Sequence, residues 1–342
     1  MATPSLKTHR IGIIGCGWIL PFHVSALQSL GPRAKIIWLA DSNLERAEKS
    51  ARSIGARAIA DYREGLSEVD AVFILLPHHL HHPVTLECLK AGCDVLVEKP
   101  IAITLAEADE MTVTAERLGR TLMVAYPHRY RPCMQLFKEA ALGGKYGRLF
   151  MLDGLMDESL QGYALGWIAK KAFLGGGVFF SSSPHMLDVM LWIAGEVRAA
   201  SMVGTKAGAE MEGEDTAASV IKFQNGVIGV TRHMWASPKS RIWFTMTAVC
   251  EKAHITLTTT PMGDLATEGC SCPWKTRIVA VGKTEEVLLD NDEGLDLLPE
   301  VKHFLDCVDT KSKPQTDGHT ARKVIELVLN AYQEAESRKA NP

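Results

Sequence analysis

The lysine at position 99 stands where acid–base chemistry could take place. It follows the short apolar run Val95–Val97, and it precedes a proline in the sequence Glu98-Lys99-Pro100. Proline biases the residue before it toward an extended conformation. Lys99 is therefore predicted just past the carboxyl end of a strand, at the rim where open α/β sheets bind ligands. Considered alone, this run also fits an ordinary surface lysine that ends a strand.

A second candidate, His185, lies in a segment that Ser183 or Pro184 can open as a helix. Asp188 follows three residues later, so the two side chains would share one helical face. The glycines at 175–177 precede this helix and can bring the backbone close to a ligand. A histidine in an otherwise apolar helix is also often structural.

These side chains suit a reaction at a hydroxyl group. An imidazole has a pKa near the operating pH, so His185 is the candidate base for the hydroxyl proton. Lys99 would donate a hydrogen bond and a positive charge where an alkoxide develops. Asp188 would orient one of these two side chains. We therefore predict Lys99, His185 and Asp188 as the catalytic residues.

A glycine-rich turn near the start of the chain predicts a dinucleotide-binding unit. The β-type run Arg10–Ile14 leads directly into the segment Gly15–Leu20, and a helical pattern follows. In such a unit Gly15 permits the tight turn, and Gly17 lets the backbone approach a pyrophosphate at the helix N-terminus. The third glycine position is occupied by Leu20, so this two-glycine match is weak by itself.

An acid ends the next predicted strand at the spacing expected for ribose binding. The strand Lys35–Ala40 is followed by Asp41, 24 residues after Gly17, close to the ~20 residues typical of the group that binds the ribose hydroxyls. Its charge would repel a 2′-phosphate, which favours NAD, although Arg46 leaves NADP possible. The alternative role of Asp41 is to cap the helix that begins at Asn43.

The run Leu76–His82 contains four histidines in five positions after the fourth predicted strand. This density suggests metal binding. However, no thiol or carboxylate pair with metal-ligand spacing flanks the run. We therefore favour a strand-end loop that lines the cofactor, over a metal site or a solvated surface, and we predict no metal.

Composition narrows the class of protein. The 342 residues suit two domains of usual size, and a net charge of −3 gives no footprint for nucleic acid or anionic membrane. No apolar run approaches the ~20 residues of a membrane span, and the first ten residues do not resemble a signal peptide, so we expect a cytoplasmic protein. The eight cysteines include no C-x-x-C pair, which favours buried thiols over disulfides or zinc.

Repeated strand–helix units fill the first part of the chain and predict a parallel sheet covered on both faces. After Asp41 these units are Ala58–Ala60 with an acidic helical patch, Val69–Leu76 with Pro83–Ala91, Val95–Val97 with a helix from Thr104 to about Leu118, and Thr121–Tyr126. We assign residues 1–126 to a Rossmann dinucleotide-binding domain.

The pattern changes after Pro127–Pro132, where a helix runs to about Leu142 and antiparallel strands follow. Asn225-Gly226 gives the strongest hairpin signal. The predicted strands are Leu149–Met156, Ala217–Gln224, Val227–Met234, Ile242–Val249, His254–Thr259, Thr276–Val281 and Glu286–Leu289.

We expect residues 127–342 to form a substrate-binding and oligomerisation α/β domain with a large, open, mainly antiparallel sheet. The closing helix, from His319 to about Glu336, is a candidate to pack back on the first domain. Helices would cover one face of the sheet. The other face, with Trp235, Trp243 and Phe244 nearby, would meet another subunit.

Taken together, these features resemble the Gfo/Idh/MocA oxidoreductases, the group of glucose–fructose oxidoreductase and inositol dehydrogenases. The matching pieces follow one another over nearly the whole chain: Gly15-x-Gly17, Asp41, Pro77–His81, Glu98-Lys99-Pro100, Arg129-Tyr130-x-Pro132, Gly175-Gly176-Gly177, His185-x-x-Asp188 and Asp317-Gly318.

The resemblance implies a nicotinamide cofactor, a sugar, cyclitol or related polyol as substrate, and a homodimer or homotetramer built through the C-terminal sheet. It assigns the family lysine to Lys99 and the active-site histidine to His185. The family usually has an aspartate four residues before that histidine, where this chain has Ser181. A serine cannot supply the charge that favours a protonated imidazole. Either Asp188 or another acid compensates, or the chemistry differs.

Two sets of binding residues follow from these arguments. The residues predicted to bind the cofactor are Gly15, Gly17, Trp18, Ile19, Asp41, Leu76, Pro77, His78, His81, Glu98, Lys99 and Arg129. Aromatic rings beside hydrogen-bonding groups suit a polyhydroxylated ring, so the residues predicted to bind the substrate are Lys99, Arg129, Asp153, Asp157, Tyr163, Trp167, Lys171 and His185.

The main prediction is an NAD(P)-dependent dehydrogenase that transfers a hydride between a secondary hydroxyl and the nicotinamide. Three alternatives are open. The first is a redox-neutral sugar-modifying enzyme that oxidises its substrate transiently with bound NAD. The second is a non-catalytic protein that binds NAD or a sugar. The third is a zinc enzyme built on the histidine run.

Overall fold

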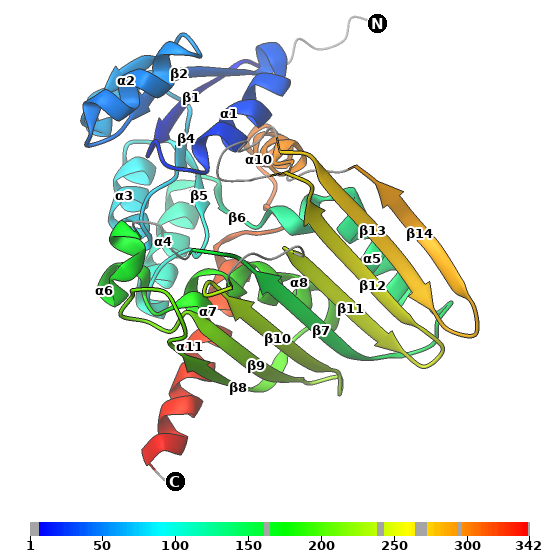
Figure 1. Cartoon of the computed structure of the whole chain (residues 1–342). Coiled ribbons are helices and arrows are strands. Elements are labelled where there is room, and N and C mark those ends of the chain that lie inside the picture. The colour runs from blue at the N-terminus through cyan, green and yellow to red at the C-terminus, as the bar shows by residue number, and fades with distance from the viewer. Residues whose placement is uncertain (1–6, 161–164, 238–242, 264–271, 293–295, 341–342) are drawn as a thin grey trace, which may run out of the picture. The chain divides into compact units, whose positions relative to one another are not determined.

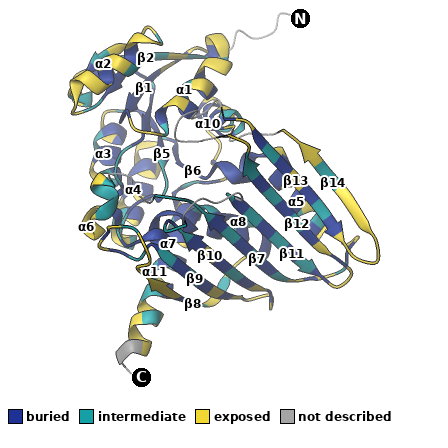
Figure 2. Ribbon diagram, in the orientation of Figure 1, coloured by how far each residue is buried: buried dark blue, intermediate teal, exposed yellow. Residues whose placement is uncertain are grey.

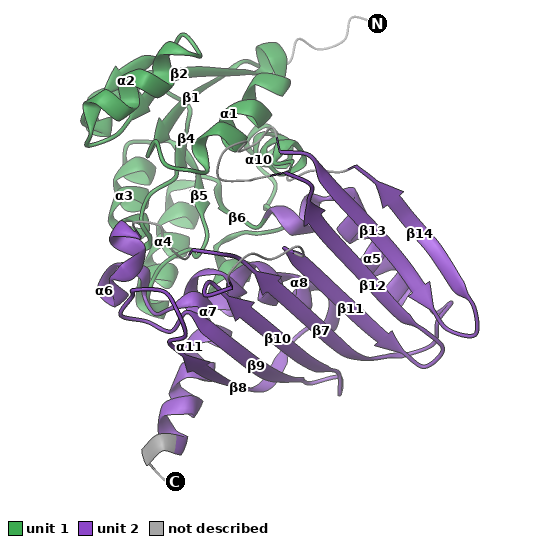
Figure 3. Cartoon of the chain, in the orientation of Figure 1, with its two compact units in different colours: residues 1–126, 296–322 green, residues 127–295, 323–342 purple. Residues whose placement is uncertain are grey.

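The computed structural model describes residues 7–160, 165–237, 243–263, 272–292 and 296–340. The chain forms two compact units, shown in Figure 3. Unit 1 comprises residues 1–126 and 296–322, and unit 2 comprises residues 127–295 and 323–342. Each unit has its own sheet. Within the described residues, no helix combines the length and the apolar composition needed to cross a membrane.

The sheet of unit 1 has six parallel strands in the order β3-β2-β1-β4-β5-β6 (Figure 1). This order, which reverses between β1 and β4, is that of a Rossmann fold. The strands are β1 (His9–Ile14), β2 (Ala34–Ala40), β3 (Arg57–Ile59), β4 (Ala71–Ile74), β5 (Asp94–Glu98) and β6 (Leu122–Ala125). The helices are α1 (Leu20–Ser29), α2 (Leu44–Arg52), α3 (His78–Lys90), α4 (Leu105–Leu118) and α10 (Leu298–Thr310).

Local sequence explains why these elements form. All four residues of β4 are buried, as expected for a central strand covered on both faces. Helix α4 begins with a capping box between Thr104 and Glu107 and ends at Gly119, which has a φ of 62°. The sequence predicted this helix with the correct bounds.

Helix α10 was missed in the sequence analysis. It belongs to unit 1 through side chains far apart in the chain. Arg33 forms ion pairs of 2.7 and 2.8 Å with Asp306 and Asp309, and the Phe304 ring packs edge-on against Phe73. These contacts are tertiary, so no local pattern near residue 300 reveals them.

Unit 2 contains an eight-stranded sheet in the order β14-β13-β12-β11-β7-β10-β9-β8. Of the neighbouring strand pairs in this order, β7 and β10 are parallel and the others are antiparallel. The strands are β7 (Leu149–Asp157), β8 (Val197–Thr205), β9 (Thr216–Phe223), β10 (Ile228–Met234), β11 (Phe244–Cys250), β12 (His254–Pro261), β13 (Trp274–Val281) and β14 (Glu285–Asn291). The predicted fold class, a Rossmann unit plus a mainly antiparallel open sheet, is confirmed. Strand β8 was not predicted.

Helices lie against one face of this sheet, and Figure 2 shows the resulting alternation of burial along its strands. They are α5 (Pro132–Leu142), the short α7 (Val178–Ser181) and α8 (Ser183–Ala194). The short α6 (Lys171–Leu174) packs beside the 3₁₀ turn at Gly166–Ala169, and α11 (Gly318–Ala340) begins in unit 1 and continues into unit 2. A Cβ added to Gly154 of β7 would lie 2.4 Å from the sulfur of Met186 on α8. Helix α8 therefore packs directly on the centre of the sheet.

Two aromatic residues expected on the open face lie elsewhere. Phe244 is 0% exposed and Trp235 is 4% exposed, so both are part of the interior of unit 2. All seven cysteines that the structure describes are buried thiols, as predicted for these positions.

Candidate active site

The turn after β1 has the geometry of a pyrophosphate-binding loop. Gly15 has a φ of 103°, and a Cβ added there would lie 2.2 Å from the carbonyl oxygen of Leu75. A Cβ added to Gly17 would have no atom of the described residues within 4 Å. The packing of unit 1 therefore requires a glycine at position 15. The space beside Gly17, in contrast, is open to a ligand.

The first turn of α1 follows this loop directly. Ile19 occupies the N-cap position and its side chain makes no capping hydrogen bond. Trp18 is 57% exposed, and its ring contacts that of Phe22, with centroids 5.1 Å apart. Pro21 has no N–H group, and the N–H groups of Leu20 and Phe22 donate to the carbonyl oxygens of Gly17 and Ile19 at 3.2 and 3.1 Å. An anion at this helix N-terminus would therefore meet the positive end of the helix dipole rather than free N–H groups of the first turn.

Asp41 connects the end of β2 to the glycine loop. Its carboxylate accepts hydrogen bonds from the backbone N–H of Cys16 at 3.0 Å and of Asn43 at 2.9 Å. Arg46 approaches the same carboxylate at 3.4 Å. The N-cap of α2 is Asn43, whose side chain accepts from the Arg46 N–H. The alternative reading of Asp41 as the helix cap is therefore wrong.

The histidine run forms the start of a helix, because α3 begins at His78. The predicted strand-end loop at these positions is therefore wrong. His81 is fully buried, and its ring nitrogens lie 2.7 Å from the Pro100 carbonyl oxygen and 2.8 Å from that of Leu76. Burial lowers the pKa of His81, although these two carbonyls act in the opposite direction. His81 thus connects the residues that follow β4 and β5. Pro77 is the N-cap of α3.

No metal-binding group is found in the described part of the chain, where a search for three or more clustered His, Cys, Asp or Glu side chains gives none. His82 instead pairs with Glu110 on α4, at 2.9 Å.

Lys99 follows the last residue of β5 and is half-buried. The carboxylate of Glu98 accepts a hydrogen bond from the Lys99 backbone N–H at 3.2 Å and lies 2.9 Å from Nε2 of the buried His23. Burial, the largest single influence, would raise the pKa of Glu98, but the hydrogen bond with His23 and the nearby positive charges of His23, Lys99 and His81 together outweigh it, so the net shift is downward. An ionised Glu98 held by His23 therefore fixes the strand end that carries Lys99.

In unit 2, His185 lies in the first turn of α8 and is half-buried. Its ring meets that of His128 edge-on, with centroids 5.4 Å apart, and His128 stacks on Phe244 at 4.5 Å. His128 is only 1% exposed. The sequence analysis did not identify His128 as a neighbour of His185. Its place beside the matched Arg129-Tyr130-x-Pro132 motif was the available signal.

Asp188, one turn after His185, is paired with Arg129. The Nε atom of Arg129 donates to the Asp188 carboxylate at 2.6 Å, and Nη2 donates to the Asp188 carbonyl oxygen at 3.1 Å. Both side chains are buried. Burial raises the pKa of Asp188 to about 6, while Arg129 opposes this shift. The structure therefore brings together two predicted site residues, and Arg129 is the partner it shows for Asp188.

The remaining substrate candidates are dispersed over unit 2. Asp153 alternates with the helix-facing Gly154 along β7, so it points to the opposite face of the sheet from α8. Asp157 ends the same strand. Trp167 is half-buried in a 3₁₀ turn, and Lys171 is exposed at the start of α6. Tyr163 lies outside the described residues.

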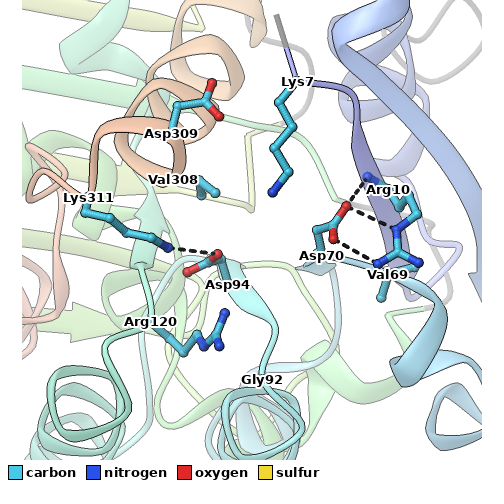
Figure 4. A pocket seen from close by; sticks show the side chains of 10 residues that line it. All are labelled: Lys7, Arg10, Val69, Asp70, Gly92, Asp94, Arg120, Val308, Asp309 and Lys311. Atoms are coloured by element: carbon cyan, nitrogen blue, oxygen red, sulfur yellow. Dashed lines mark hydrogen bonds and ion pairs between the residues drawn. The ribbon is translucent and has the colours of Figure 1, made fainter.

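A cavity of about 400 Å³ lies at the opposite edge of the unit 1 sheet from Gly15 and Lys99 (Figure 4). Asp70, before β4, accepts three hydrogen bonds from Arg10, and Asp94 at the start of β5 lies 3.7 Å from Lys311. Ligands of open α/β sheets bind at the carboxyl ends of the strands. This ion-paired cavity at the amino ends is therefore not the candidate site.

Comparison with known proteins agrees with this geometry. Residues 9–126 match the Gfo/Idh/MocA oxidoreductase family model, described as an NAD-binding Rossmann fold. Residues 134–256 match the model of the C-terminal domain of the same family. The two models together account for more than half of the chain.

Individual relatives include two curated dehydrogenases and one solved structure. D-glucoside 3-dehydrogenase of Escherichia coli K12 is 27% identical, over 64% of this chain and 68% of that protein. Inositol 2-dehydrogenase 2 of Saccharopolyspora erythraea is 32% identical, over 65% of each chain. Levoglucosan dehydrogenase, in complex with NADH and levoglucosan, is 18% identical and superimposes with a TM-score of 0.83, over 97% of this chain and 98% of that one.

Proposed function

This chain belongs to the Gfo/Idh/MocA family of NAD-binding oxidoreductases, and we propose that it transfers a hydride between a secondary hydroxyl of a sugar, cyclitol or related polyol and the nicotinamide, with Lys99 and His185 at the reacting oxygen. The observation that carries the proposal is the loop after β1, where Gly15 is required by packing and the space at Gly17 is open.

The residues of unit 1 fit a bound dinucleotide. The pyrophosphate would lie over the loop from Gly15 to Ile19 at the start of α1, where the space beside Gly17 is open and the positive end of the helix dipole favours an anion. Asp41 would accept hydrogen bonds from the ribose hydroxyls, which favours NAD over NADP. Leu76, Pro77, His78, Glu98 and Arg129 are proposed as further contacts. The nicotinamide supplies the hydride chemistry when it is bound. We propose that residues 1–126 constitute this domain.

His81 holds together the segments that follow β4 and β5, at the carboxyl ends of these strands. Because it is fully buried and both ring nitrogens face carbonyl oxygens, we assign it to holding the strand ends together, where it acts on the cofactor through Leu76 and Pro100.

We assign proton transfer to one side chain and stabilisation of negative charge to another. His185 takes the hydroxyl proton during oxidation, because imidazole changes charge near neutral pH. Lys99 stabilises the developing alkoxide with its positive charge. The buried pair of Arg129 and Asp188 holds the face of α8 on which His185 lies. Asp188 is thus a positioning residue: its ion pair with Arg129 fixes helix α8, and α8 carries the base His185.

The substrate class follows from the relatives, whose names specify a glucoside, inositol and levoglucosan. We propose residues 127–342 as the substrate-binding domain, with Trp167 and Lys171 as contacts from the segment before the glycines. Asp153 and Asp157 of β7 are less suited, because both alternate with the helix-facing Gly154 and so point away from α8.

We further propose that the protein acts in the cytoplasm as a homodimer or homotetramer. The face of the unit 2 sheet opposite α8 carries exposed apolar side chains on neighbouring strands, including Val203 at 70%, Val220 at 56% and Ile228 at 39%. A second copy of the same face would bury them. Light scattering after gel filtration, with Val220→Lys as the disrupting variant, tests this assembly.

The experiment that tests the function follows the near-ultraviolet absorbance of reduced nicotinamide. The protein is mixed with excess NAD, then NADP, against cyclitols, aldoses, sugar acids and glycosides. We expect a rise with NAD for one substrate family. Lys99→Met and His185→Asn should each lower kcat/KM by ~100-fold or more while cofactor affinity stays within about twofold.

Two results would overturn the assignment. Near-wild-type turnover in both variants would exclude Lys99 and His185 as the reacting groups. A flat absorbance trace with a chemically changed sugar would instead establish the redox-neutral alternative, in which the oxidation is reversed within each turnover.

A further inference from the structure

The carboxylate of Glu158 occupies an unusual setting in unit 2. Glu158 follows the last residue of β7, and its backbone N–H donates to the Met234 carbonyl oxygen at 2.9 Å. Its side chain accepts three hydrogen bonds, from Trp235 Nε1 at 2.9 Å, Ser182 Oγ at 3.0 Å and Trp243 Nε1 at 3.3 Å. Backbone and side chain are thus both fixed.

The side-chain donors to Glu158 among the described residues, Ser182, Trp235 and Trp243, are all neutral. Within the described residues, no Lys, Arg or His side chain forms an ion pair with Glu158. Indole and hydroxyl groups donate hydrogen bonds to a carboxylate without bringing a compensating positive charge. The charge of Glu158 is therefore available to act on groups nearby.

His185 is connected to Glu158 by two routes. Ser182 donates its hydroxyl to Glu158, and its carbonyl oxygen accepts the His185 backbone N–H at 3.3 Å. On the other side, the ring of His128 contacts both His185, at 5.4 Å, and Trp243, at 5.9 Å. The carboxylate and the imidazole therefore share the same immediate neighbours.

The other ionisable side chains on the described elements of unit 2 that pack against α8 are paired, neutral or on the far face of the sheet. Asp153 and Asp157 of β7 and Arg232 of β10 alternate with the buried, helix-facing positions, so they point away from α8. Arg129 and Asp188 form a pair with each other. His233 on β10 is buried, which lowers its pKa to about 3, so it is neutral near pH 7. His128 is buried among rings, and α7, which ends at Ser181, has no ionisable side chain.

We infer that Glu158 is a positioning residue for the reaction: its negative charge stabilises the protonated imidazole of His185 and so sets the pH at which His185 can accept a proton. The inference rests on the proposed role of His185 as the base. It also supplies the acid that Ser181 cannot. Near the base, a carboxylate of fixed geometry raises the affinity of the imidazole for a proton.

The test measures the titration of His185 by NMR in protein labelled with carbon-13 at the histidine rings. The His185→Asn variant assigns the resonance. In Glu158→Gln, which keeps the shape and removes the charge, we expect the His185 pKa to fall by about half a unit or more. Glu158→Asp, which keeps the charge, should restore at least half of the difference. All variants retain Lys99, so its contribution cancels.

A matched control is Glu139→Gln, which removes the same charge from an exposed position on α5. We expect no measurable change in the His185 titration. An unchanged His185 pKa in Glu158→Gln, or an equal fall in Glu139→Gln, would overturn the inference.

The Glu158→Gln variant could fail to fold, because the glutamine NH₂ group and the indole N–H of Trp243 are both hydrogen-bond donors and would face each other. The double variant Glu158→Gln/Trp243→Phe removes that donor, and it is compared with Trp243→Phe alone. The same fall in the His185 pKa is expected between these two proteins, and no fall would again overturn the inference.

Activity gives an independent readout. The acidic limb of the kcat/KM profile follows the pKa of the base, so Glu158→Gln should move it to lower pH by the same amount as the NMR titration. An NMR shift in a protein that shows no dehydrogenase activity would establish the electrostatic link between Glu158 and His185 while the proposed function fails. An acidic limb that does not move, in an active variant with a shifted His185 pKa, would overturn the link between Glu158 and the reaction.

Discussion

The proposed cofactor edge of unit 1 and the histidine region of unit 2 are built from different parts of the chain. At the cofactor edge the backbone provides most of the geometry: Gly15 fits under the Leu75 carbonyl, and Asp41 accepts from backbone N–H groups. Around His185 side chains from distant segments provide most of the packing, as in the stack of His128 on Phe244. A backbone site depends on a few glycines and strand ends, whereas a side-chain site depends on the packing of a whole unit.

The buried carboxylates show the consequence. Glu98 accepts both from the Lys99 backbone N–H and from His23, and its pKa shifts down despite burial. Asp188 is bound by Arg129 through one oxygen, while Oδ1 has no hydrogen-bond partner among the described atoms, and burial raises its pKa to about 6. At Glu98, hydrogen bonds to both oxygens and several nearby positive charges offset the effect of burial, whereas at Asp188 one bonded oxygen and one cation do not.

The largest effect is expected from breaking the ion pair between Arg129 and Asp188. Arg129→Met leaves Asp188 buried without its cation, which should lower the free energy of unfolding by about 3–5 kcal/mol. Urea denaturation at pH 7 measures the loss. The double variant Arg129→Met/Asp188→Leu removes both charges and should recover most of it. Equal losses in the single and double variants would mean that the pair is not the source of the stability.

The next prediction concerns pH. The pKa of Asp188 is raised in the folded protein, from an ordinary value of 3.8 to about 6. Protonation therefore favours the folded state, and this contribution is complete below pH 4 and lost as the pH rises through about 6. Relative to Asp188→Asn, the wild type should lose about 3 kcal/mol of stability between pH 4 and pH 7. Parallel stability curves for the two proteins would contradict the raised pKa.

The two glycines of the cofactor loop separate packing from ligand binding. Gly15→Ala should destabilise unit 1 by more than about 2 kcal/mol, since its Cβ would overlap the Leu75 carbonyl at a positive φ. Gly17→Ala should fold like the wild type but weaken NAD binding by about 10- to 100-fold. Thermal unfolding and calorimetric titration with NAD measure the two effects. Normal NAD affinity in Gly17→Ala would remove the loop from the cofactor site.

The smallest expected effect is a change in cofactor preference. Asp41→Ser removes the charge that repels a 2′-phosphate and leaves Arg46 nearby, so the ratio of kcat/KM for NAD over NADP should fall by about tenfold. Asn43→Ala removes the cap of α2 without changing the charge, and should leave the ratio unaltered. A constant ratio in Asp41→Ser would show that other residues select the cofactor.

The sequence by itself determined the features that depend on short-range rules. The strand–glycine–helix order, Asp41 at the end of β2 and the hairpin at Asn225-Gly226 are local patterns, and each lies where it was predicted. The bounds of α4 followed from a capping box and a terminal glycine. Backbone conformation is controlled by neighbouring residues in these cases, so spacing was sufficient.

Only the tertiary structure decided which side chains meet. The histidine run reads as a loop in sequence, yet His81 is buried because its ring bonds to two strand-end carbonyls. Arg129 and Asp188 are 59 residues apart and form one ion pair, and Glu158 meets Trp235 and Trp243 across three strands. The energy of such contacts depends on burial and on donors brought from distant segments, which local sequence does not encode.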